Sequence, residues 1–552
     1  MSTAAANVPS HRRMLVGDVL ASRMGSGTAY RAATQYERQV AMWRPPLRSA
    51  DAEILRDAAK VRARARDLYR NHPYAKQAVR MAALAVVGKK LRFSTRVDHK
   101  FLGINVEEAD RWGAEFDRLW DIYAHGEGAW CDAGRRGSFS ALMRLAARTR
   151  MVDGEVLGTL EWYPERRWRT SLQIVDVDRL SNPDGAPDTS YLKGGVALDD
   201  GSAPVGYWIR DGHPADLGVD AAARSMHWSY VPRETAWGRP VVSHSFVQER
   251  AGQTRGISDF TTVILSMRQE QEFADADLAS AIMQAMYALV IKSNMDHTKA
   301  MEVLGAEVEV DENGNPVNPM TGLMLDQLAV AAAYHNEAKI AGFDGGRIPH
   351  LMIGEELQLV TPGNKGSNAI EFSKAAVKKF SAGLGGEPIS IGQDFSDVNY
   401  SSARMSVANN WRTHEITRGD LVYDVGLPLV RAFMEEVLHA EVLPLPKGVA
   451  PADLYEALPA LAKGQFLSSG PPMLDPVKER QGQQLGWAIG LDTLEEMAAE
   501  EGEDWREKVV QKGREIAFMR ANGVPIPGEP VVPAMAAAPA ADAASGGDGG
   551  DA

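Results

Sequence analysis

The longest regular pattern of hydrophobic and polar positions in this chain runs from Ser258 to Lys292. Apolar residues recur there at helical steps, no proline or glycine intervenes, and Ser258 and Asp259 suit a helix start. At roughly 1.5 Å per residue such a helix spans about 50 Å, more than a compact domain usually needs. Its ends are apolar and its middle turns are charged, so the pattern predicts a strut between two packed regions. The alternative is one long helix within an ordinary α-rich core.

Helical patterns and then β patterns precede this strut. The helical segments repeat apolar residues every three or four positions, whereas short runs of branched and aromatic residues between turns begin at Gly154. We therefore predict several helices followed by a small antiparallel sheet. The predicted helices are Asp51–Arg70, Tyr74–Val87, Glu107–Tyr123 and Ser138–Arg150, and the predicted strands are Val156–Tyr163, Ser171–Asp178, Gly195–Leu198 and Val205–Arg210.

The pattern after the strut is less regular at first and then helical again. A glycine-bearing loop separates two of the later helices, and a tail of Ala, Pro, Gly and Asp from Gly528 onward is predicted to be disordered. Capping signals predict the last helices. In order, we predict a helix at Met324–Lys339, an extended segment at Leu351–Thr361, helices at Asn368–Leu384 and Ser402–Val425, a break at Gly426-Leu427-Pro428, helix again to about Val442, and further helices from Asp475.

Composition narrows the class of protein. With 552 residues the chain has material for about three or four domains. Its formal charge of −13 argues against a broad basic face that grips nucleic acid, although not against a protein that lets nucleic acid pass. The basic residues of the first helix are explained better by a solvated face with acidic partners than by contact with a polyanion. These residues are Lys60, Arg62, Arg64 and Arg66.

Targeting and redox signals are few. Cys131 is the single cysteine, so no intrachain disulfide can form, and a reducing cytosol is the expected compartment. The chain start lacks an apolar segment long enough for a signal peptide, and no run of 18 apolar residues occurs. We therefore expect neither export nor a membrane partner.

Sequence motifs for catalysis are absent. The glycine-rich stretches Gly342–Gly346 and Gly363–Gly366 lack the lysine and hydroxyl residue of a phosphate-binding loop, and no HExxH pair occurs. The histidines of the β region are more often structural than metal ligands. They are His213, His227 and His244.

Acidic pairs are the remaining candidates for chemistry. Asp275 with Asp277, or Asp394 with Asp397, could in principle hold magnesium, but solvated faces are the commoner explanation. Cys131 lacks the cationic setting of a nucleophile. We therefore predict no enzymatic activity, no metal and no cofactor.

Several stretches, taken in order over roughly residues 50 to 520, resemble the portal proteins of tailed double-stranded DNA bacteriophages of the lambda-like branch. Lys89-Lys90 departs from the family pattern, in which a second glycine commonly follows Gly88, and residues 300 to 350 match no pattern. The matching stretches are the arginine-rich first helix with its Asn71-His72-Pro73 break, Val86-Val87-Gly88, Asp153-Gly154-Glu155, Leu172-Gln173-Ile174, Asp176 to Leu180, Gly206-Tyr207-Trp208-Ile209, Gln253 to Ser258, and Asp394 to Arg404.

The resemblance implies an α+β portal fold with a wing, a stem of long helices, a clip and a helical crown, assembling as a ring of usually twelve subunits at one capsid vertex. By chain order it implies a flexible N-terminal arm at 1–48, a wing of helices and a small antiparallel sheet at 49–257, a first stem helix at 258–293, a clip at 294–365, a second stem helix at 366–385, a tunnel loop at 386–401, a long wing helix and following segment at 402–474, a crown at 475–523 and a disordered tail at 524–552.

The resemblance also implies partners and sites. Expected partners are identical subunits, double-stranded DNA that passes without sequence specificity, terminase, major capsid and scaffolding proteins, and head-completion or connector proteins, in a virion assembled in the bacterial cytoplasm. Acidic stem residues should line the channel, since repulsion of phosphates lets a duplex slide. The channel candidates are Glu270, Glu272, Asp275 and Asp277; the tunnel-loop candidates are Gln393, Asp394, Ser396, Asp397, Asn399 and Tyr400; and the structural motif residues are Gln253, Arg255, Gly256, Ser258, Ser401, Ser402 and Arg404.

Two other classes compete with a DNA conduit. One is a DNA-processing enzyme, such as a nuclease or packaging motor, which the missing phosphate loop disfavours. The other is a capsid scaffold or adaptor, which would differ from a portal in subunit stoichiometry. A ring with a central hole would separate these classes.

Overall fold

The computed structural model describes residues 42–286, 289–293, 310–314, 341–343, 346–348, 355–359, 366–394, 396, 399–471, 473 and 475–526, with scattered positions between 317 and 333. Most of the expected arm, most of the expected clip, most of the predicted helix at 324–339, Asp397 and the tail after residue 526 lie outside the described residues.

Helices are the commonest regular elements of the described chain, and their starts follow ordinary capping chemistry. Ser49 accepts a hydrogen bond from the Ala52 amide at the first long helix, and Pro73 occupies the opening turn of the next. The helices are α2 (Ala50–Asn71), α3 (Pro73–Val87), α4 (His99–Leu102), α5 (Val106–His125), α6 (Phe139–Asp153), α7 (Val219–Ser225), α8 (Ile264–Met286), α11 (Gly366–Leu384), α12 (Pro388–Gly392), α13 (Tyr400–Leu421), α14 (Leu427–His439), α15 (Leu454–Leu461), α16 (Pro476–Ala488), α17 (Leu494–Glu500) and α18 (Trp505–Ala521).

The strands form several small sheets instead of the single predicted one. Their order is β3-β2-β8 in one sheet and β4-β5-β6-β7 in another, with the pairs β1-β13, β9-β12 and β10-β11, and all named pairs are antiparallel. The strands are β1 (Arg92–Thr95), β2 (Glu155–Trp162), β3 (Thr170–Val175), β4 (Leu192–Lys193), β5 (Val196–Leu198), β6 (Pro204–Arg210), β7 (Trp228–Pro232), β8 (Val242–Phe246), β9 (Leu289–Ser293), β10 (Ala341–Phe343), β11 (Gly346–Ile348), β12 (Glu355–Leu359) and β13 (Gly464–Leu467).

Short helical turns complete the chain. The 3-10 turns are η2 (Val177–Arg179), η3 (Pro183–Gly185), η4 (Asp259–Thr262) and η6 (Pro451–Asp453), and the π turn is η5 (Val422–Gly426). None of the helices in the described part is both long and apolar enough to cross a membrane.

The predicted strut is shorter than its pattern suggested. Its first turn is the 3-10 turn η4, the α-helix α8 covers 23 residues, and Leu289–Ser293 is a strand. At about 1.5 Å per residue, α8 spans roughly 35 Å instead of 50 Å. The end of the prediction was wrong because Val290 and Ile291 are β-branched and find a partner in β12, where Ile291 lies opposite Leu357.

Two further predictions require correction. The helix does not break at Gly426: it continues from α13 through the π turn into α14, with helical dihedral angles at Gly426 and Leu427. A Cβ at position 426 would lie 3.2 Å from the Phe466 ring, so the absence of a side chain at Gly426 lets this ring pack closely against the helix. In addition, α12 occupies part of the segment expected to be a loop at 386–401.

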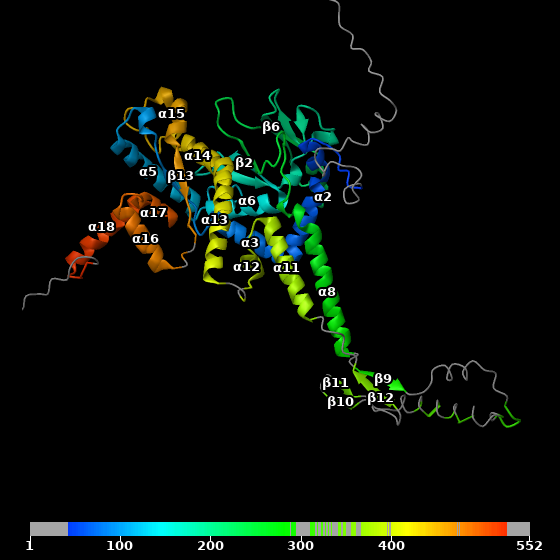
Figure 1. Cartoon of the computed structure of the whole chain (residues 1–552). Coiled ribbons are helices and arrows are strands. Elements are labelled where there is room, and N and C mark those ends of the chain that lie inside the picture. The colour runs from blue at the N-terminus through cyan, green and yellow to red at the C-terminus, as the bar shows by residue number, and fades with distance from the viewer. Residues whose placement is uncertain are drawn as a thin grey trace, which may run out of the picture.

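The largest hydrophobic core joins α5, α6 and α14 around aromatic side chains. The rings of Tyr123 and Phe433 stack with centroids 3.9 Å apart, and Trp120 packs edge-on against Phe433. All three side chains are buried. Figure 1 shows α8 and α11 leaving this body side by side toward β9–β12, while α16, α17 and α18 lie on the opposite side of it.

Candidate functional site

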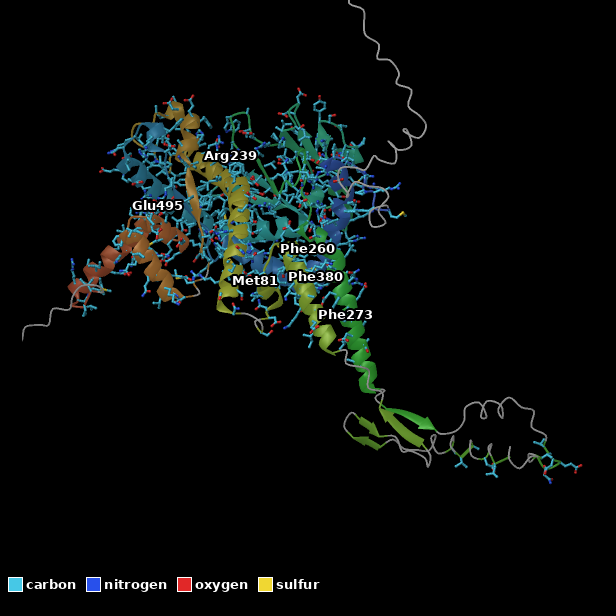
Figure 2. All side chains as sticks on the ribbon, in the orientation of Figure 1. Met81, Arg239, Phe260, Phe273, Phe380 and Glu495 are labelled. Carbon is cyan, nitrogen blue, oxygen red and sulfur yellow. The ribbon has the colours of Figure 1, made fainter. Side chains whose placement is uncertain are left out.

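The root of the two projecting helices is firmly packed. Phe260 and Met267 from the η4–α8 segment and Phe380 from α11 are buried in one cluster with α2, α3 and α6. Figure 2 places the labelled Phe260 and Phe380 near this root and Phe273 farther along α8. The packing fixes both helices to the body at one end only.

Beyond the root, α8 and α11 expose apolar surface. Phe273 contacts Phe372 of α11 with ring centroids 4.4 Å apart, yet both rings are partly exposed. Leu278 is 61% exposed and Ile370 is 63% exposed, with Leu265 and Ile282 also on the surface. Large exposed apolar side chains gathered on one part of a protein are typical of a site of association, so this outer stretch can pack against another molecule.

The four acidic candidates of α8 divide into two groups. Glu272, Asp275 and Asp277 are exposed, and Glu272 accepts a hydrogen bond from Arg268 Nε at 3.1 Å. Glu270 is only 7% exposed. Its Oε2 lies 3.3 Å from His72 Nε2, where the chain passes from α2 to α3. Glu270 therefore joins α8 to the helix pair, and its expected channel-facing position does not fit its burial.

His72 contacts both projecting helices. Besides Glu270 of α8, its ring meets Phe380 of α11 edge-on at a centroid distance of 6.1 Å. Burial lowers the pKa of His72 below its ordinary value, although the Glu270 carboxylate acts in the opposite direction. The Asn71-His72-Pro73 break thus places a buried imidazole at the junction of helix pair and stem.

The motif Gln253 to Ser258 forms the entry to the stem and contains a buried ion pair. Arg255 Nη2 lies 2.5 Å from Glu155 Oε1, and the Gly256 amide donates to Glu155 Oε2 at 3.1 Å. Gly256 has no room for a side chain, because a Cβ there would lie 2.1 Å from the Gly154 carbonyl oxygen. Gln253 closes the preceding turn by accepting hydrogen bonds from the amides of Glu249 and Arg250.

Glu155 is the centre of this charge network. It is fully buried and also contacts Arg62 at 3.0 Å and His244 at 3.0 Å. Burial alone would raise the pKa of Glu155, but the Arg255 charge and the hydrogen bonds from His244 and Arg255 hold it well below its ordinary value. The network joins α2, β2, β8 and the stem entry in one charged cluster.

The network corrects one prediction about the first helix. Arg62 is 5% exposed, so it does not belong to a solvated face. Arg66 pairs with Asp153 at 2.7 Å and with Asp178 at 2.6 Å, both distant in sequence. The i,i+4 spacing of the two arginines directs both side chains to the same side of α2. On that side they meet acidic residues from segments that are distant in sequence.

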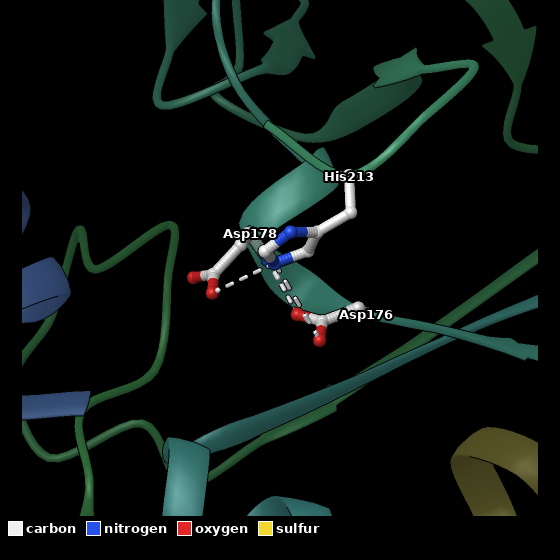
Figure 3. A group of neighbouring side chains, drawn as sticks. All are labelled: Asp176, Asp178 and His213. Carbon is white, nitrogen blue, oxygen red and sulfur yellow. Dashed lines mark hydrogen bonds and ion pairs between the residues drawn. The ribbon is translucent and has the colours of Figure 1, made fainter. Parts of the chain in front are cut away.

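A carboxylate and imidazole cluster lies at the edge of the same network. His213 Nε2 is 3.5 Å from Asp178 Oδ2 and 3.9 Å from Asp176 Oδ2, as Figure 3 shows. These donor atoms are close enough together to bind a metal ion. However, Arg66 also contacts both carboxylates and Arg62 contacts Asp178. Two guanidinium groups already compensate the acids, so the arrangement suits an ion-pair network better than a cation.

The expected tunnel-loop residues lie between α12 and α13. Gln393 adopts a left-handed conformation with φ of 53° at the end of α12. Hydrogen bonds from Ser396 and the nearby Lys374 ammonium hold the pKa of the exposed Asp394 at about 2. Asn399 caps α13 by accepting a 2.8 Å hydrogen bond from the Ser402 amide. The helix begins at Tyr400, and Ser401, Ser402 and Arg404 lie exposed in its first turns.

The helices α16–α18 attach to the body mainly through polar contacts. Ion pairs join Arg92 to Glu507 at 2.6 Å and Arg96 to Glu495 at 2.5 Å. Neither α16 nor α18 has a buried residue. The exposed apolar side chains of this unit include Leu485, Trp487, Val510 and Phe518.

Sequence reasoning missed the charge network although its signal was present. Arg62 and Arg66 stand four residues apart, and acidic residues flank the predicted strands at Asp153, Glu155 and Asp178. Nothing in one sequence shows which of these distant charges meet. The prediction did place Arg255 and Gly256 among structural motif residues, and both contact Glu155.

Comparisons with known proteins match most of the chain to phage portal proteins. A family model described as phage portal protein, lambda family, matches residues 36–418. The portal protein of Escherichia phage N15 is 31% identical over 490 residues, covering 88% of this chain and 89% of that protein. Portal protein B of Escherichia phage lambda is 30% identical over 493 residues, covering 89% of each.

Similarity to solved structures is weaker. The neck of an empty GTA particle aligns with a TM-score of 0.45 and 15% identity, covering 83% of this chain and 95% of that one. An HK97-family phage portal protein from Corynebacterium diphtheriae aligns with a TM-score of 0.29 and 11% identity, covering 70% and 92%. The family relationship therefore rests on the sequence matches.

Proposed function

Because the chain belongs to the lambda family of phage portal proteins, we propose that identical copies form a closed ring around an axial channel for double-stranded DNA at one capsid vertex. The resemblance to the family suggests twelve subunits. A head-to-tail contact repeated around an axis can close into a ring, in which both sides of the contact are occupied in every subunit. The ring would serve both packaging and ejection of the genome.

The observation that best supports this proposal is the outer stem. Helices α8 and α11 are rooted in the body by Phe260, Met267 and Phe380, yet beyond the root they expose Leu278 and Ile370. A neighbouring copy would bury this apolar surface at roughly 25 cal/mol per Å². Stem helices that stand side by side around an axis would form the channel wall.

We further propose that Glu272, Asp275 and Asp277 face the channel. All three are exposed and lie on the part of α8 that its own protomer leaves uncovered. Carboxylates repel phosphates and release no counterions on contact, so DNA would slide instead of binding. Glu270 is left out of this set because it is buried against His72.

The segment 386–401 is proposed as the tunnel loop. The Asn399 cap fixes the conformation near its C-terminal end, and the turn formed by Gln393, Asp394 and Ser396 follows α12 in its middle. Asp397 and Tyr400 complete the proposed set on the basis of family resemblance alone. The same resemblance assigns 294–365 to the clip and 475–523 to the crown.

The proposed partners follow from the same role. Terminase would dock on the ring and supply ATP hydrolysis, and connector proteins would replace it later, in a virion assembled in the bacterial cytoplasm with capsid and scaffolding proteins. The chain itself would carry out no catalysis. The competing reading as a packaging motor or nuclease requires turnover by the purified protein.

The decisive experiment is to purify the full chain and determine its mass in solution and its shape by negative-stain imaging. We expect a ring with a central hole and no ATP hydrolysis. A stable monomer at high concentration would contradict the proposal, and robust nucleotide hydrolysis or DNA cleavage would favour the enzyme.

The channel assignment needs a separate measurement. We expect the triple variant Glu272→Gln, Asp275→Asn and Asp277→Asn to form rings normally and to slow DNA packaging in a terminase-driven assay. The matched control is Glu456→Gln, which removes an exposed carboxylate of α15. Normal packaging by the triple variant would show that these carboxylates do not govern passage.

A further inference from the structure

A group of arginine and aromatic side chains covers the tip of the β2–β3 hairpin and the neighbouring 128–137 loop. Arg166 Nη2 donates to the Ala133 carbonyl at 3.0 Å, and Ser171 Oγ donates to the Trp130 carbonyl at 2.8 Å, so hairpin and loop lie together. We call this group the arginine–aromatic surface. It consists of Arg135, Arg136, Arg166, Arg167 and Arg169 with Trp130, Trp162 and Tyr163, and Trp237 adjoins it through Glu435 and Arg239.

Stacking holds several of these guanidinium groups in place. Arg135 lies 3.9 Å from the centroid of the Trp130 ring, and Arg166 lies 3.6 Å from that of Tyr163. Arg169 lies 5.6 Å from the Trp162 ring centroid. Cation–π contacts of this kind orient a planar guanidinium and reduce the entropy lost when it binds an anion.

These arginines lack carboxylate partners. Within the described part of the chain, none of the five is in an ion pair, although Arg239 beside them pairs with Glu435. Residues 128–137 and 161–169 carry these five arginines and three acids, Asp132, Glu161 and Glu165, which leaves an excess of two positive charges. This excess stands out in a chain of net charge −13.

The arginine–aromatic surface also exposes apolar rings. Trp162 is 46% exposed and Trp237 is 54% exposed. Trp237 is held by a 2.9 Å hydrogen bond from its Nε1 to Glu435, which fixes the exposed ring. Figure 2 labels Arg239, which lies 5.0 Å from the Trp162 ring centroid, on the side of the body away from the stem.

We propose that the arginine–aromatic surface is a docking site for an acidic segment of a partner protein that also carries apolar side chains. Tryptophan, tyrosine and arginine are the residues that most often dominate the energy of protein interfaces. An acidic segment would find guanidinium groups that have no carboxylate partner among the described residues, and its apolar residues would cover the exposed parts of Trp162 and Trp237.

Nucleic acid fits this surface less well. Affinity for a duplex grows with the number of neutralised phosphates, and an excess of two charges on an acidic protein neutralises few. Single strands bind by stacking bases on aromatic rings, but Trp130 and Tyr163 already carry arginines of this chain. Exposed indole faces contribute little to contact with a phosphate backbone.

The test is a fluorescence anisotropy titration of the full-length protein with a labelled peptide of glutamates interspersed with phenylalanines. We expect binding that weakens with added salt and falls about tenfold in Arg135→Ala/Arg166→Ala. The Arg135→Lys/Arg166→Lys variant retains the charges without the planar stacking groups, and we expect an intermediate loss. The matched control Arg111→Ala changes an exposed arginine of α5 and should leave binding unchanged.

Several outcomes would overturn the proposal. One is absence of peptide binding by wild-type protein that is folded by circular dichroism. Another is tighter binding of a mixed-sequence duplex that is lost in the same alanine variant, since this would assign the surface to nucleic acid. Affinity unchanged in either arginine variant would remove the stacked guanidinium groups from the site. Cross-links from this surface to a second copy would make it a subunit contact.

Discussion

Helices α14 and α18 differ in how much of their surface the chain itself covers. Nine of the 13 residues of α14 are buried, including Phe433, whereas none of the 17 residues of α18 is buried. Even the acidic residues of α14 have partners: Glu436 accepts hydrogen bonds from the amides of Arg169 and Thr170. Within the described part of the chain, the body is thus well covered, while the outer stem and α16–α18 leave apolar side chains exposed.

The sharpest way to break the body is to remove its central carboxylate. We expect Glu155→Ala to cost about 5 kcal/mol of unfolding free energy, because Arg255 would stay buried without a carboxylate partner and the buried Arg62 would keep only Asp178. Urea unfolding followed by circular dichroism measures the loss. The exposed Glu456→Gln is the control, and a loss below about 1 kcal/mol would show that water or another group compensates the arginines.

Two phenylalanines of α11 test the boundary between body and stem. Phe380 is fully buried and Phe372 is 44% exposed. We expect Phe380→Ala to cost about 4 kcal/mol in unfolding of the single chain. Phe372→Ala should cost much less there, but it should weaken ring formation in sedimentation velocity. Equal losses of stability, with assembly unaffected, would place the boundary elsewhere.

Protonation of Asp117 tests the contact between the body and α18. Burial raises the pKa of Asp117 to about 7, against the hydrogen bonds from Thr95, and the nearby Asp504 charge also raises it. A carboxyl whose folded-state pKa is raised contributes stability that is complete below the unfolded pKa of about 4 and is lost as the pH rises to about 7. The loss is at most about 1.4 kcal/mol per pKa unit.

We therefore expect the unfolding free energy of the wild type to fall relative to that of Asp117→Asn as the pH rises from about 4 to about 7, because the variant has no carboxyl to ionise at this position. Thermal unfolding at several pH values measures it. The exposed Asp57→Asn serves as the control. A difference independent of pH would mean that Asp117 titrates as in the unfolded chain.

The smallest effect concerns the attachment of α18 by exposed ion pairs. Arg92–Glu507 and Arg506–Asp110 lie at the surface, where each pair contributes up to about 1 kcal/mol and salt screens it. We expect hydrogen exchange in α18 to accelerate in high salt while exchange in α14 stays slow. Equal protection at both salt concentrations would show that apolar contacts hold α18.

The local pattern of apolar and capping residues was sufficient to predict the helices and the root of the stem. The apolar steps and caps of α2, α3, α5 and α6 depend on neighbouring residues, so their ranges were predicted to within a few positions. The resemblance carried by Gln253 to Ser258 also located a structurally central segment. The strut was predicted too long because β9 depends on pairing with β12, more than 60 residues away in sequence.

The sequence by itself determined the helical periodicity, the caps, the family and the excess of acidic residues. Only the tertiary structure decided that Glu270 faces inward to His72 while Glu272 stays exposed, and that Arg62 is buried with Glu155 while Arg135 has no carboxylate partner among the described residues. The physical reason is that the energy of a charge depends on its burial and on its neighbours in space. Those neighbours come from segments that one chain's sequence does not connect.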